Sequence, residues 1–139
     1  MLIDTNVILD YVLKREGVAQ NTLLCLERLI ISKAKMWLTA STITDIYYVS
    51  RRVLQDGTAA KNIIAKLLNS FQIAAVDKTD CVNALNTPIN DYEDALVSVC
   101  AKKVKAELII SRNEKDFRNS AVQALSPADF LSNPKYKPE

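Results

Sequence analysis

Short apolar runs alternate along this chain with longer stretches in which apolar residues recur at helical spacing. Strand-like runs occupy residues 1–3, 36–40, 72–76, 108–110 and 122–125. Segments of helical periodicity lie between and after them, at residues 7–13, 18–32, 43–54, 59–68, 80–85, 92–104 and 127–131. Strands that alternate with helices favour a parallel sheet that is covered on both faces. We therefore expect the α/β class, as a three-layer α/β/α sandwich with about five strands.

Three of the helical segments support more specific predictions. The segment of residues 92–104 is apolar nearly all round, which is typical of a helix that is buried on most sides. Ser41 and Thr42 are N-cap candidates for the helix that runs to about Leu54. The segment of residues 18–32 is amphipathic, and its buried side is predicted to carry Leu23, Leu26, Ile30 and Ile31.

The length of 139 residues suits a single hydrophobic core, and we expect one domain over residues 1–132. Residues 133–139 contain two prolines and two lysines and are predicted to form a flexible C-terminal tail. No run approaches about 18 uninterrupted apolar residues, so we expect no membrane-spanning helix. Asp4 and Asp10 interrupt the first apolar stretch, and no basic segment precedes it. This pattern argues against a signal peptide and predicts a cytoplasmic protein.

The residue types that are missing from the chain narrow its possible chemistry. There is no histidine, which excludes a Ser-His-Asp triad, a Cys-His pair and a histidine-based ribonuclease mechanism. The two glycines, Gly17 and Gly57, are isolated, so neither a phosphate-binding P-loop nor a GxGxxG fingerprint can form. An enzyme of this composition would depend on carboxylates, lysines, hydroxyl groups or metal ions, and the chain carries 16 Asp and Glu residues.

The cysteines and the net charge are less informative. The three cysteines lie far apart among apolar residues and form no CxxC pair, which is typical of reduced, buried thiols. A net charge of +2 is too small to indicate nucleic-acid binding by itself. Basic clusters are typical of solvated helix faces and are also compatible with phosphate contacts around a cleft. They lie at residues 14–15, 51–52, 102–105 and 115–118.

Five aspartates lie where the predicted strands end or the next helices begin. Asp4 ends the first strand, Asp45 lies in the first turn of the helix after the second strand, and Asp116 follows the fourth strand. Asp91 and Asp94 open the buried helix, one turn apart on the same face. Because ligands of open parallel sheets bind outside the carboxyl ends of the strands, we expect these acids to converge. Crowded carboxylates favour Mg²⁺ or Mn²⁺ between them, and such ions can activate water for phosphodiester hydrolysis without a histidine.

Each of these acids also has a structural interpretation. Asp91 could be the N-cap and Asp94 the N3 residue of their helix, and Thr42 with Asp45 could form a similar capping box. Asp116 could cap a turn. Asp4 is the hardest to explain in this way, because an acid between an apolar strand and an apolar helix is costly to bury without a partner. The other aspartates that we expect in turns, in caps or on the surface are Asp10, Asp77, Asp80 and Asp129.

Four segments that contain these acids resemble the motifs of PIN domains. Residues 2–10, LIDTNVILD, resemble the opening strand and loop, in which the Asp ligates metal and the following Thr-Asn shape the site. Residues 41–45, STITD, resemble the second motif, and residues 91–96, DYEDAL, resemble the third, whose final Asp is a metal ligand. Residues 110–117, ISRNEKDF, resemble the fourth. The motifs occur in order and with the family's spacing over essentially the whole chain.

The resemblance implies a parallel sheet of strand order 3-2-1-4-5, divalent-metal-dependent endoribonuclease activity and often homodimers. For VapC-like toxins it also implies an antitoxin protein that blocks the site. The chain departs from the family pattern where Asp45 replaces the usual Glu, so that its ligation would be indirect or through water. It departs again where Asn113 replaces the Asp of many toxins, which leaves Asp116 as the fourth carboxylate.

The resemblance also assigns roles to individual residues. Asp4, Asp94 and Asp116 would bind one or two Mg²⁺ or Mn²⁺ ions, with Asp45 as a fourth catalytic carboxylate. A metal-activated water would then attack an RNA phosphodiester in line. The residues expected to support these carboxylates are Thr5, Asn6, Asp91, Ser111 and Asn113.

Two other functions are compatible with parts of this pattern. The nearest alternative is a PIN-like domain without activity that binds RNA or a partner protein, which the changes at Asp45 and Asn113 leave open. Failure to bind Mg²⁺ or Mn²⁺ would favour that alternative. A phosphoacceptor receiver domain could use Asp77 as its acceptor. However, the acidic pair after the first strand and the late strand-end lysine that receivers share are not evident in the sequence.

Overall fold

The computed structural model of the chain describes residues 1–137 and contains one five-stranded parallel sheet. The strands are β1 (Leu2–Ile3), β2 (Trp37–Thr39), β3 (Gln72–Ala74), β4 (Ile109–Ile110) and β5 (Ala124–Leu125). Their spatial order is β3-β2-β1-β4-β5, so β1 lies in the centre. Leu2 pairs with Trp37 of β2 on one side and with Ile109 of β4 on the other. The predicted fold class and strand order are therefore confirmed.

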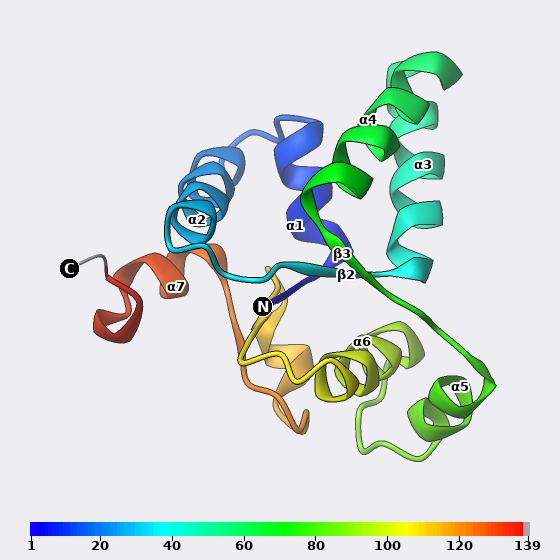
Figure 1. Cartoon of the computed structure of the whole chain (residues 1–139), viewed down its shortest axis with the longest axis vertical. Helices are drawn as coiled ribbons and strands as arrows, with labels where there is room; N and C mark the ends of the chain where they lie inside the picture. The colour runs from blue at the N-terminus through cyan, green and yellow to red at the C-terminus, as the bar shows by residue number, and fades with distance from the viewer. Residues whose placement is uncertain (138–139) are drawn as a thin grey trace.

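Helices cover both faces of this sheet (Figure 1). One face carries α1 (Thr5–Val12), α2 (Ala19–Ile31), α3 (Ala40–Leu54) and α4 (Gly57–Ser70). The other carries α5 (Lys78–Leu85), α6 (Tyr92–Lys103) and the 3₁₀ helix η1 (Glu114–Phe117). The last α-helix, α7 (Pro127–Ser132), contacts α2 and β5. None of the helices in residues 1–137 combines the length and the apolar composition needed to cross a membrane.

The sheet divides the hydrophobic core into two parts. Successive side chains of a strand point to opposite faces, so Ile3 packs among α1 to α4, whereas Leu2 packs against α6. Both residues have no exposed surface, as expected of a central parallel strand that is covered on both sides. On the α6 side the core includes Val97, Cys100 and Phe117. The chain therefore buries its first strand completely and brings the residues after it to one defined edge.

The buried side of α2 differs from the prediction. Ile30 and Ile31 are 60% and 78% exposed, and the residues that α2 buries are Thr22, Cys25, Leu26 and Leu29. These four follow helical spacing along the side that faces α1 and α7. The prediction holds for Leu26 and is wrong for Ile30 and Ile31, because helical spacing from Cys25 and Leu26 places Leu29 on the buried side and turns the two isoleucines toward solvent.

Residues 134–136, which we expected in a flexible tail, form a short 3₁₀ helix, η2 (Pro134–Tyr136). The ring of Tyr136 stacks on Phe130 with 4.9 Å between centroids, and Lys135 Nζ lies 2.8 Å from Glu107 Oε1. The tail therefore carries an aromatic ring that packs against α7, and its flexibility stays a prediction. Residues 138 and 139 lie outside the described part of the chain, and the domain boundary at residue 132 stays a prediction.

Candidate active site

Asp4 lies at the junction between the central strand β1 and helix α1. It is the N-cap of α1, since its Oδ1 accepts a hydrogen bond from the Thr5 N–H at 2.8 Å. Its Oδ2 accepts a second hydrogen bond from the Ser111 hydroxyl at 2.7 Å, and only 5% of the residue is exposed. Burial, the largest cause, raises the pKa of Asp4; the two hydrogen bonds lower it, and the charges of Asp116 and Asp91 raise it further. Asp4 is thus a buried carboxylate that lies within reach of other acids.

The first turn of α6 carries the next carboxylates. Asp91 is the N-cap of α6, and its Oδ1 accepts the N–H of Asp94 at 3.1 Å. Asp94 is half-buried, and its pKa is raised to about 7, first by burial and then by the charges of Asp4, Asp91, Asp116 and Glu93. A capping role explains the position of Asp91. It does not explain the raised pKa of Asp94, because the N-terminus of a helix favours a charged carboxylate and so lowers its pKa. The same turn therefore serves as a helix cap and as part of an acidic cluster.

The loop after β4 brings Asp116 to the same edge of the sheet. Ser111 is completely buried, and its hydroxyl oxygen also accepts the N–H of Asn113 at 3.1 Å. The 3₁₀ helix η1 follows, and Phe117, only 2% exposed, packs it into the core beside α6. Asp116 precedes this buried ring and is itself exposed. The buried residues Ser111 and Phe117 therefore fix the loop to the core, while the carboxylate of Asp116 remains exposed to solvent.

A buried ion pair fixes the same loop against α1. Asp10 is 1% exposed, with its Oδ2 at 3.1 Å from Arg112 Nε and its Oδ1 at 3.2 Å from Arg15 Nη1. One turn earlier in α1, Asn6 accepts the backbone N–H of Arg112 at 3.2 Å. The expectation that Asp10 lies in a turn, in a cap or on the surface is wrong, because two arginines neutralise its carboxylate and allow it to be buried. Asn6 and Asp10 therefore hold the residue that follows Ser111.

Helix α3 begins earlier than the sequence predicted, and this changes the position of Asp45. The N-cap of α3 is Thr39, whose Oγ1 accepts the N–H of Thr42 at 3.2 Å, so neither Ser41 nor Thr42 is the N-cap. Asp45 consequently lies beyond the first turn of α3, and the suggested capping box of Thr42 with Asp45 does not form. Burial raises the pKa of Asp45.

Glu93 is a member of the cluster that was not predicted from the sequence. Burial raises its pKa, and the charges of Asp45, Asp4 and Asp91 raise it further. Because it lies next to Asp94 in the first turn of α6, its position in the third motif was the signal that could have identified it. Glu93 therefore connects Asp45 electrostatically with the remaining acids.

These side chains line a cavity of about 570 Å³ at the carboxyl edge of the sheet. Of the predicted site residues, those that line it are Asp4, Thr5, Asn6, Asp91, Asp94, Asn113 and Asp116. Asp45 and Ser111 are not part of this lining; Ser111 lies below it, bonded to Asp4. Further lining residues that carry hydrogen-bond donors or charge are Asn90, Glu93, Lys115, Arg118 and Asn119. The cavity thus combines a carboxylate floor with basic groups nearby.

A chain of buried hydroxyl groups supports the floor of the cavity from the side of α3. The Oγ1 atoms of Thr5 and Thr42 lie 2.9 Å apart, and the same distance separates Thr42 Oγ1 from Thr39 Oγ1 and Thr39 Oγ1 from Ser41 Oγ. Such a network fixes its members only if each one keeps a partner. It joins the first residue of α1, next to Asp4, to the N-terminus of α3.

The donor set suits a hard divalent cation. Carboxylate oxygens are the ligands that Mg²⁺ and Mn²⁺ prefer, and the charges of Asp4, Asp91, Asp94 and Asp116 oppose ionisation of their neighbours until a cation neutralises them. Within residues 1–137, however, no three ligand side chains already converge closely enough to hold an ion. Asp4 is fixed by two hydrogen bonds, so any convergence has to come from movement of the more exposed carboxylates.

The fold and the acidic edge together define the class of protein. A family model described as the PIN domain matches residues 1–115, and the chain belongs to this family. The match includes the first three motifs and ends immediately before Asp116. A comparison with curated proteins gives no match.

Solved structures of low sequence identity share the fold over nearly the whole chain. FitAcB from Neisseria gonorrhoeae is 20% identical with a TM-score of 0.69, and the match covers 91% of this chain and 97% of that chain. FitAB bound to the IR36 DNA fragment is 18% identical with a TM-score of 0.73, covering 99% and 96%. VapBC2 from Rickettsia felis, solved with a DNA fragment from the VapBC2 promoter, is 13% identical with a TM-score of 0.68. The match covers 90% of this chain and 96% of that chain.

Proposed function

We propose that the chain is a divalent-metal-dependent endoribonuclease and the toxin of a toxin–antitoxin pair. The observation that carries this proposal is the convergence of Asp4, Asp94 and Asp116 on one cavity, from three segments that are far apart in the sequence. Burial, the largest cause, raises the pKa of Asp4 and of Asp94, and the charges of neighbouring acids raise both further, a pattern that is frequent among functional carboxylates. The chain has no histidine, so a metal-assisted route is the hydrolytic mechanism that these side chains can support.

In this proposal Asp4, Asp94 and Asp116 hold one or two Mg²⁺ or Mn²⁺ ions. When bound, such an ion activates water and neutralises the charge that develops on the phosphodiester. Asp4 is the fixed ligand, because Ser111 and the Thr5 N–H orient its carboxylate. Asp94 and Asp116, which are more exposed, complete the site by turning toward it.

The other residues of the cavity have supporting roles in this proposal. Glu93 lines the cavity in which we had expected Asp45, and the pKa of Glu93 is raised first by burial and then by the charge of Asp45. Asn113 and Asn119 offer amide groups to the RNA, and Lys115 and Arg118 offer positive charge to its phosphates. Asn6 and Asp91 position the loop after β4 and the first turn of α6.

The test is cleavage of fluorescent single-stranded RNA by the purified chain with Mg²⁺, with Mn²⁺ or with EDTA. Asp4→Asn and Asp94→Asn are expected to reduce the metal-dependent rate by at least about a hundredfold, since each removes a charged ligand. Glu27→Gln is the matched control, because Glu27 is an exposed carboxylate on α2 and does not line the acidic cavity. Full metal-dependent activity in Asp4→Asn or Asp94→Asn would overturn the assignment.

The wild type and Asp94→Asn also test the alternative function, a PIN domain without activity that binds RNA or a partner protein. The observation that favours it is that the ligand side chains of the described residues are not yet arranged around a common point. Calorimetric titration with Mn²⁺ separates the two functions. Binding that Asp94→Asn weakens supports the nuclease, and absence of binding at millimolar Mn²⁺ supports a module that only binds RNA or protein.

The proposed partner is a cognate antitoxin, as the resemblance to VapC-like proteins implies. Likeness to FitAB and VapBC2, each solved with DNA, supports this part of the proposal. Expression of the wild-type chain should slow growth, and co-expression of a small DNA-binding protein encoded next to it should restore growth. The homodimer that the resemblance implies stays a prediction.

A further inference from the structure

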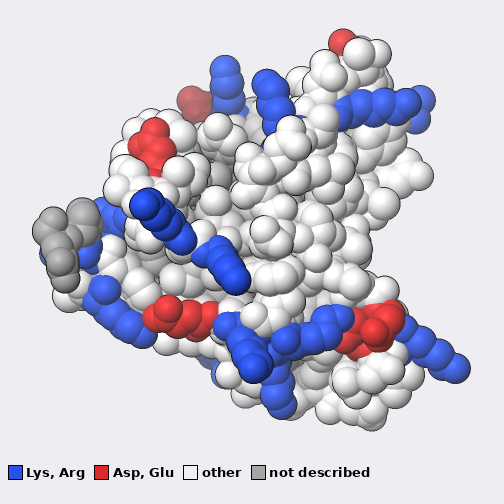
Figure 2. Space-filling model, viewed as in Figure 1, with Lys and Arg blue, Asp and Glu red and all other residues white. Residues whose placement is uncertain are grey.

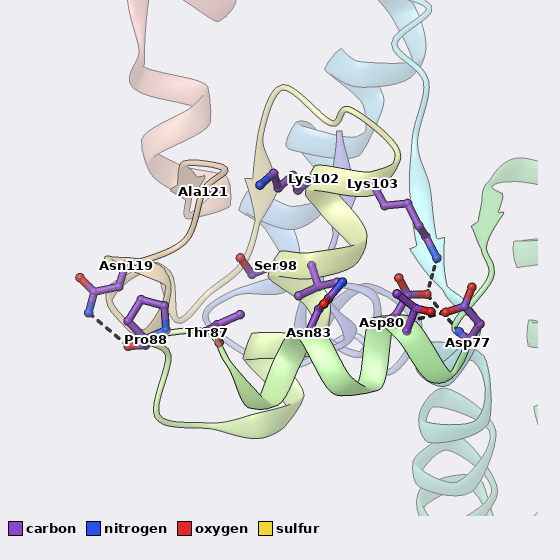
Figure 3. A pocket seen from close by; sticks show the side chains of 12 residues that line it. Asp77, Asp80, Asn83, Thr87, Pro88, Ser98, Lys102, Lys103, Asn119 and Ala121 are labelled. Carbon is purple, nitrogen blue, oxygen red and sulfur yellow. Dashed lines mark hydrogen bonds and ion pairs between the residues drawn. The ribbon is translucent and has the colours of Figure 1, made fainter.

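A second cavity, of about 770 Å³, lies between α5, α6 and the segment after η1 (Figure 3). Its polar lining residues are Asp77, Thr79, Asp80, Asn83, Thr87, Ser98, Lys102, Lys103 and Asn119. Pro88, Val99 and Ala121 form its apolar wall. The proposed catalytic carboxylates Asp4, Asp94 and Asp116 do not line this cavity.

The second cavity adjoins the acidic one. Pro88 and Asn119 line both cavities, and the Asn119 Nδ2 donates a hydrogen bond to the Pro88 carbonyl at 3.4 Å. This contact joins the loop before α6 to the segment after η1 (Figure 3). A ligand that is longer than the acidic cavity can therefore continue across Pro88 and Asn119 into the second cavity.

The two lysines of the second cavity differ in their availability. Lys103 donates to the Asp80 carboxylate and to the carbonyl of Ala75, and these contacts hold it at the α5 end. Burial raises the pKa of Asp80, but the hydrogen bond from Lys103 and the N–H of Asp77 outweigh it and leave the pKa below its ordinary value. Lys103 is thus neutralised by an ionised partner.

Lys102 is exposed and forms no ion pair with any residue in 1–137. In Figure 3 its side chain points away from Lys103, toward the side of the cavity where Ala121 lies. Figure 2 shows Lys and Arg side chains on both halves of this face, and those over the α6 half lie among acidic side chains. Lys102, on the side that leads to Asn119, is therefore the lysine of this cavity that no carboxylate in residues 1–137 neutralises, while the carboxylate of Asp77 lies at the α5 end beside the Lys103–Asp80 pair.

The lining of the second cavity suits a nucleic-acid backbone better than a stack of bases. No aromatic ring is among its lining residues in the described chain, so bases cannot stack on a platform there. Its amide and hydroxyl groups, with one uncommitted lysine, match phosphate oxygens and ribose hydroxyls. Pro88 and Ala121 offer apolar surface against which a ribose can rest.

We infer that the second cavity binds the backbone of the RNA strand beyond the cleavage site. The strand leaves the acidic cavity across Pro88 and Asn119, and Lys102 contacts one of its phosphates. The inference rests on the proposed nuclease function and extends it. We therefore expect the affinity for RNA to increase with RNA length and not to depend on the sequence of the flanking nucleotides.

The test measures binding of fluorescent single-stranded RNAs of increasing length by anisotropy, in the Asp94→Asn background to prevent cleavage. Adding Lys102→Ala is expected to weaken binding of the longer RNAs by about fivefold at moderate salt, as the loss of one phosphate contact implies. The slope of log affinity against log salt should become shallower by about 0.7. Lys61→Ala is the matched control, since Lys61 is exposed on α4 at the opposite face of the sheet.

The inference is overturned if Lys102→Ala and Lys61→Ala give the same affinities and salt slopes at every RNA length. A loss that is equal for the shortest and the longest RNA would also contradict it, because the shortest RNA fills the acidic cavity alone. These outcomes are separate from those of the proposed function. Cleavage by the wild type and its loss in Asp94→Asn are measured independently of the binding series.

Discussion

Removing the charge of Asp94 should stabilise the metal-free protein at alkaline pH. The pKa of Asp94 in the folded chain is raised from 3.8 to about 7, first by burial and then by the charges of neighbouring acids. An acid whose folded-state pKa exceeds its unfolded value destabilises the fold as the pH rises from the lower value through the higher one. The penalty is complete above about pH 7 and absent below about pH 4. Asp94→Asn removes the charge and keeps the size of the side chain.

The expected magnitude follows from three contributions. The rise in pKa would correspond to about 4 kcal/mol if it were fully expressed as stability. Asp94 is only half-buried, so solvent screening reduces this to about 2 kcal/mol. The Asp94→Asn variant also forgoes the favourable interaction of a carboxylate with the N-terminus of α6, which is worth about 0.3–1 kcal/mol. The net gain is about 1 kcal/mol, or about 3 °C in melting temperature for a chain of this size.

The assay is urea and thermal unfolding followed by circular dichroism, in EDTA, at about pH 8.5 and at about pH 4, where the gain should vanish. Glu27→Gln serves as the control, because Glu27 is exposed and does not line the acidic cavity. Addition of Mg²⁺ at the higher pH should stabilise the wild type more than Asp94→Asn and so reverse their order. An Asp94→Asn variant that is less stable than the wild type in EDTA at the higher pH would refute the reasoning.

Two further predictions concern the residues that hold the cavity in place. Ser111→Ala removes the hydrogen bond to Asp4 Oδ2, and we expect a loss of about 1–2 kcal/mol in unfolding free energy by urea titration, with an Mn²⁺ affinity at least about tenfold weaker by calorimetry. An unchanged Mn²⁺ affinity would show that Ser111 does not orient a ligand. Thr42→Val interrupts the buried hydroxyl chain and leaves Thr5 and Thr39 each short of a partner, so it should cost about 1–3 kcal/mol in the same urea assay. A variant as stable as the wild type would mean that the three hydroxyl groups are not coupled.

Much of the fold could be predicted because its elements depend on local patterns. Strand-like runs separated by helical stretches identify a parallel sheet, and the resemblance to PIN domains supplied the order of the strands. The position of Asp91 at a helix N-terminus also follows from local preferences. Apart from the strand order, these features require only the neighbours along the chain.

The N-cap of α3 was misplaced by two to three residues within one local segment, whereas the other errors concern features that depend on distant residues. Asp10 is buried because Arg112, from the loop after β4, reaches its carboxylate, and nothing near Asp10 in the sequence indicates this partner. The burial of Leu29 and the exposure of Ile31 depend on which side of α2 packs against α1 and α7. Glu93 lines the cavity because several segments meet there, and this meeting cannot be read from the segment of Glu93 alone.

The position of the central strand has a consequence for the order in which the protein can form during synthesis. β1 pairs with β4, and the hydrogen bond from Ser111 to Asp4 joins residues 107 positions apart. Contacts of such long sequence separation form late, because the intervening chain must first be closed into a loop. A growing chain therefore exposes Asp4 on the ribosome with no partner strand on the β4 side until residue 111 has emerged. If the chain cuts RNA as proposed, its messenger is largely translated before the nascent product can acquire an assembled acidic cavity.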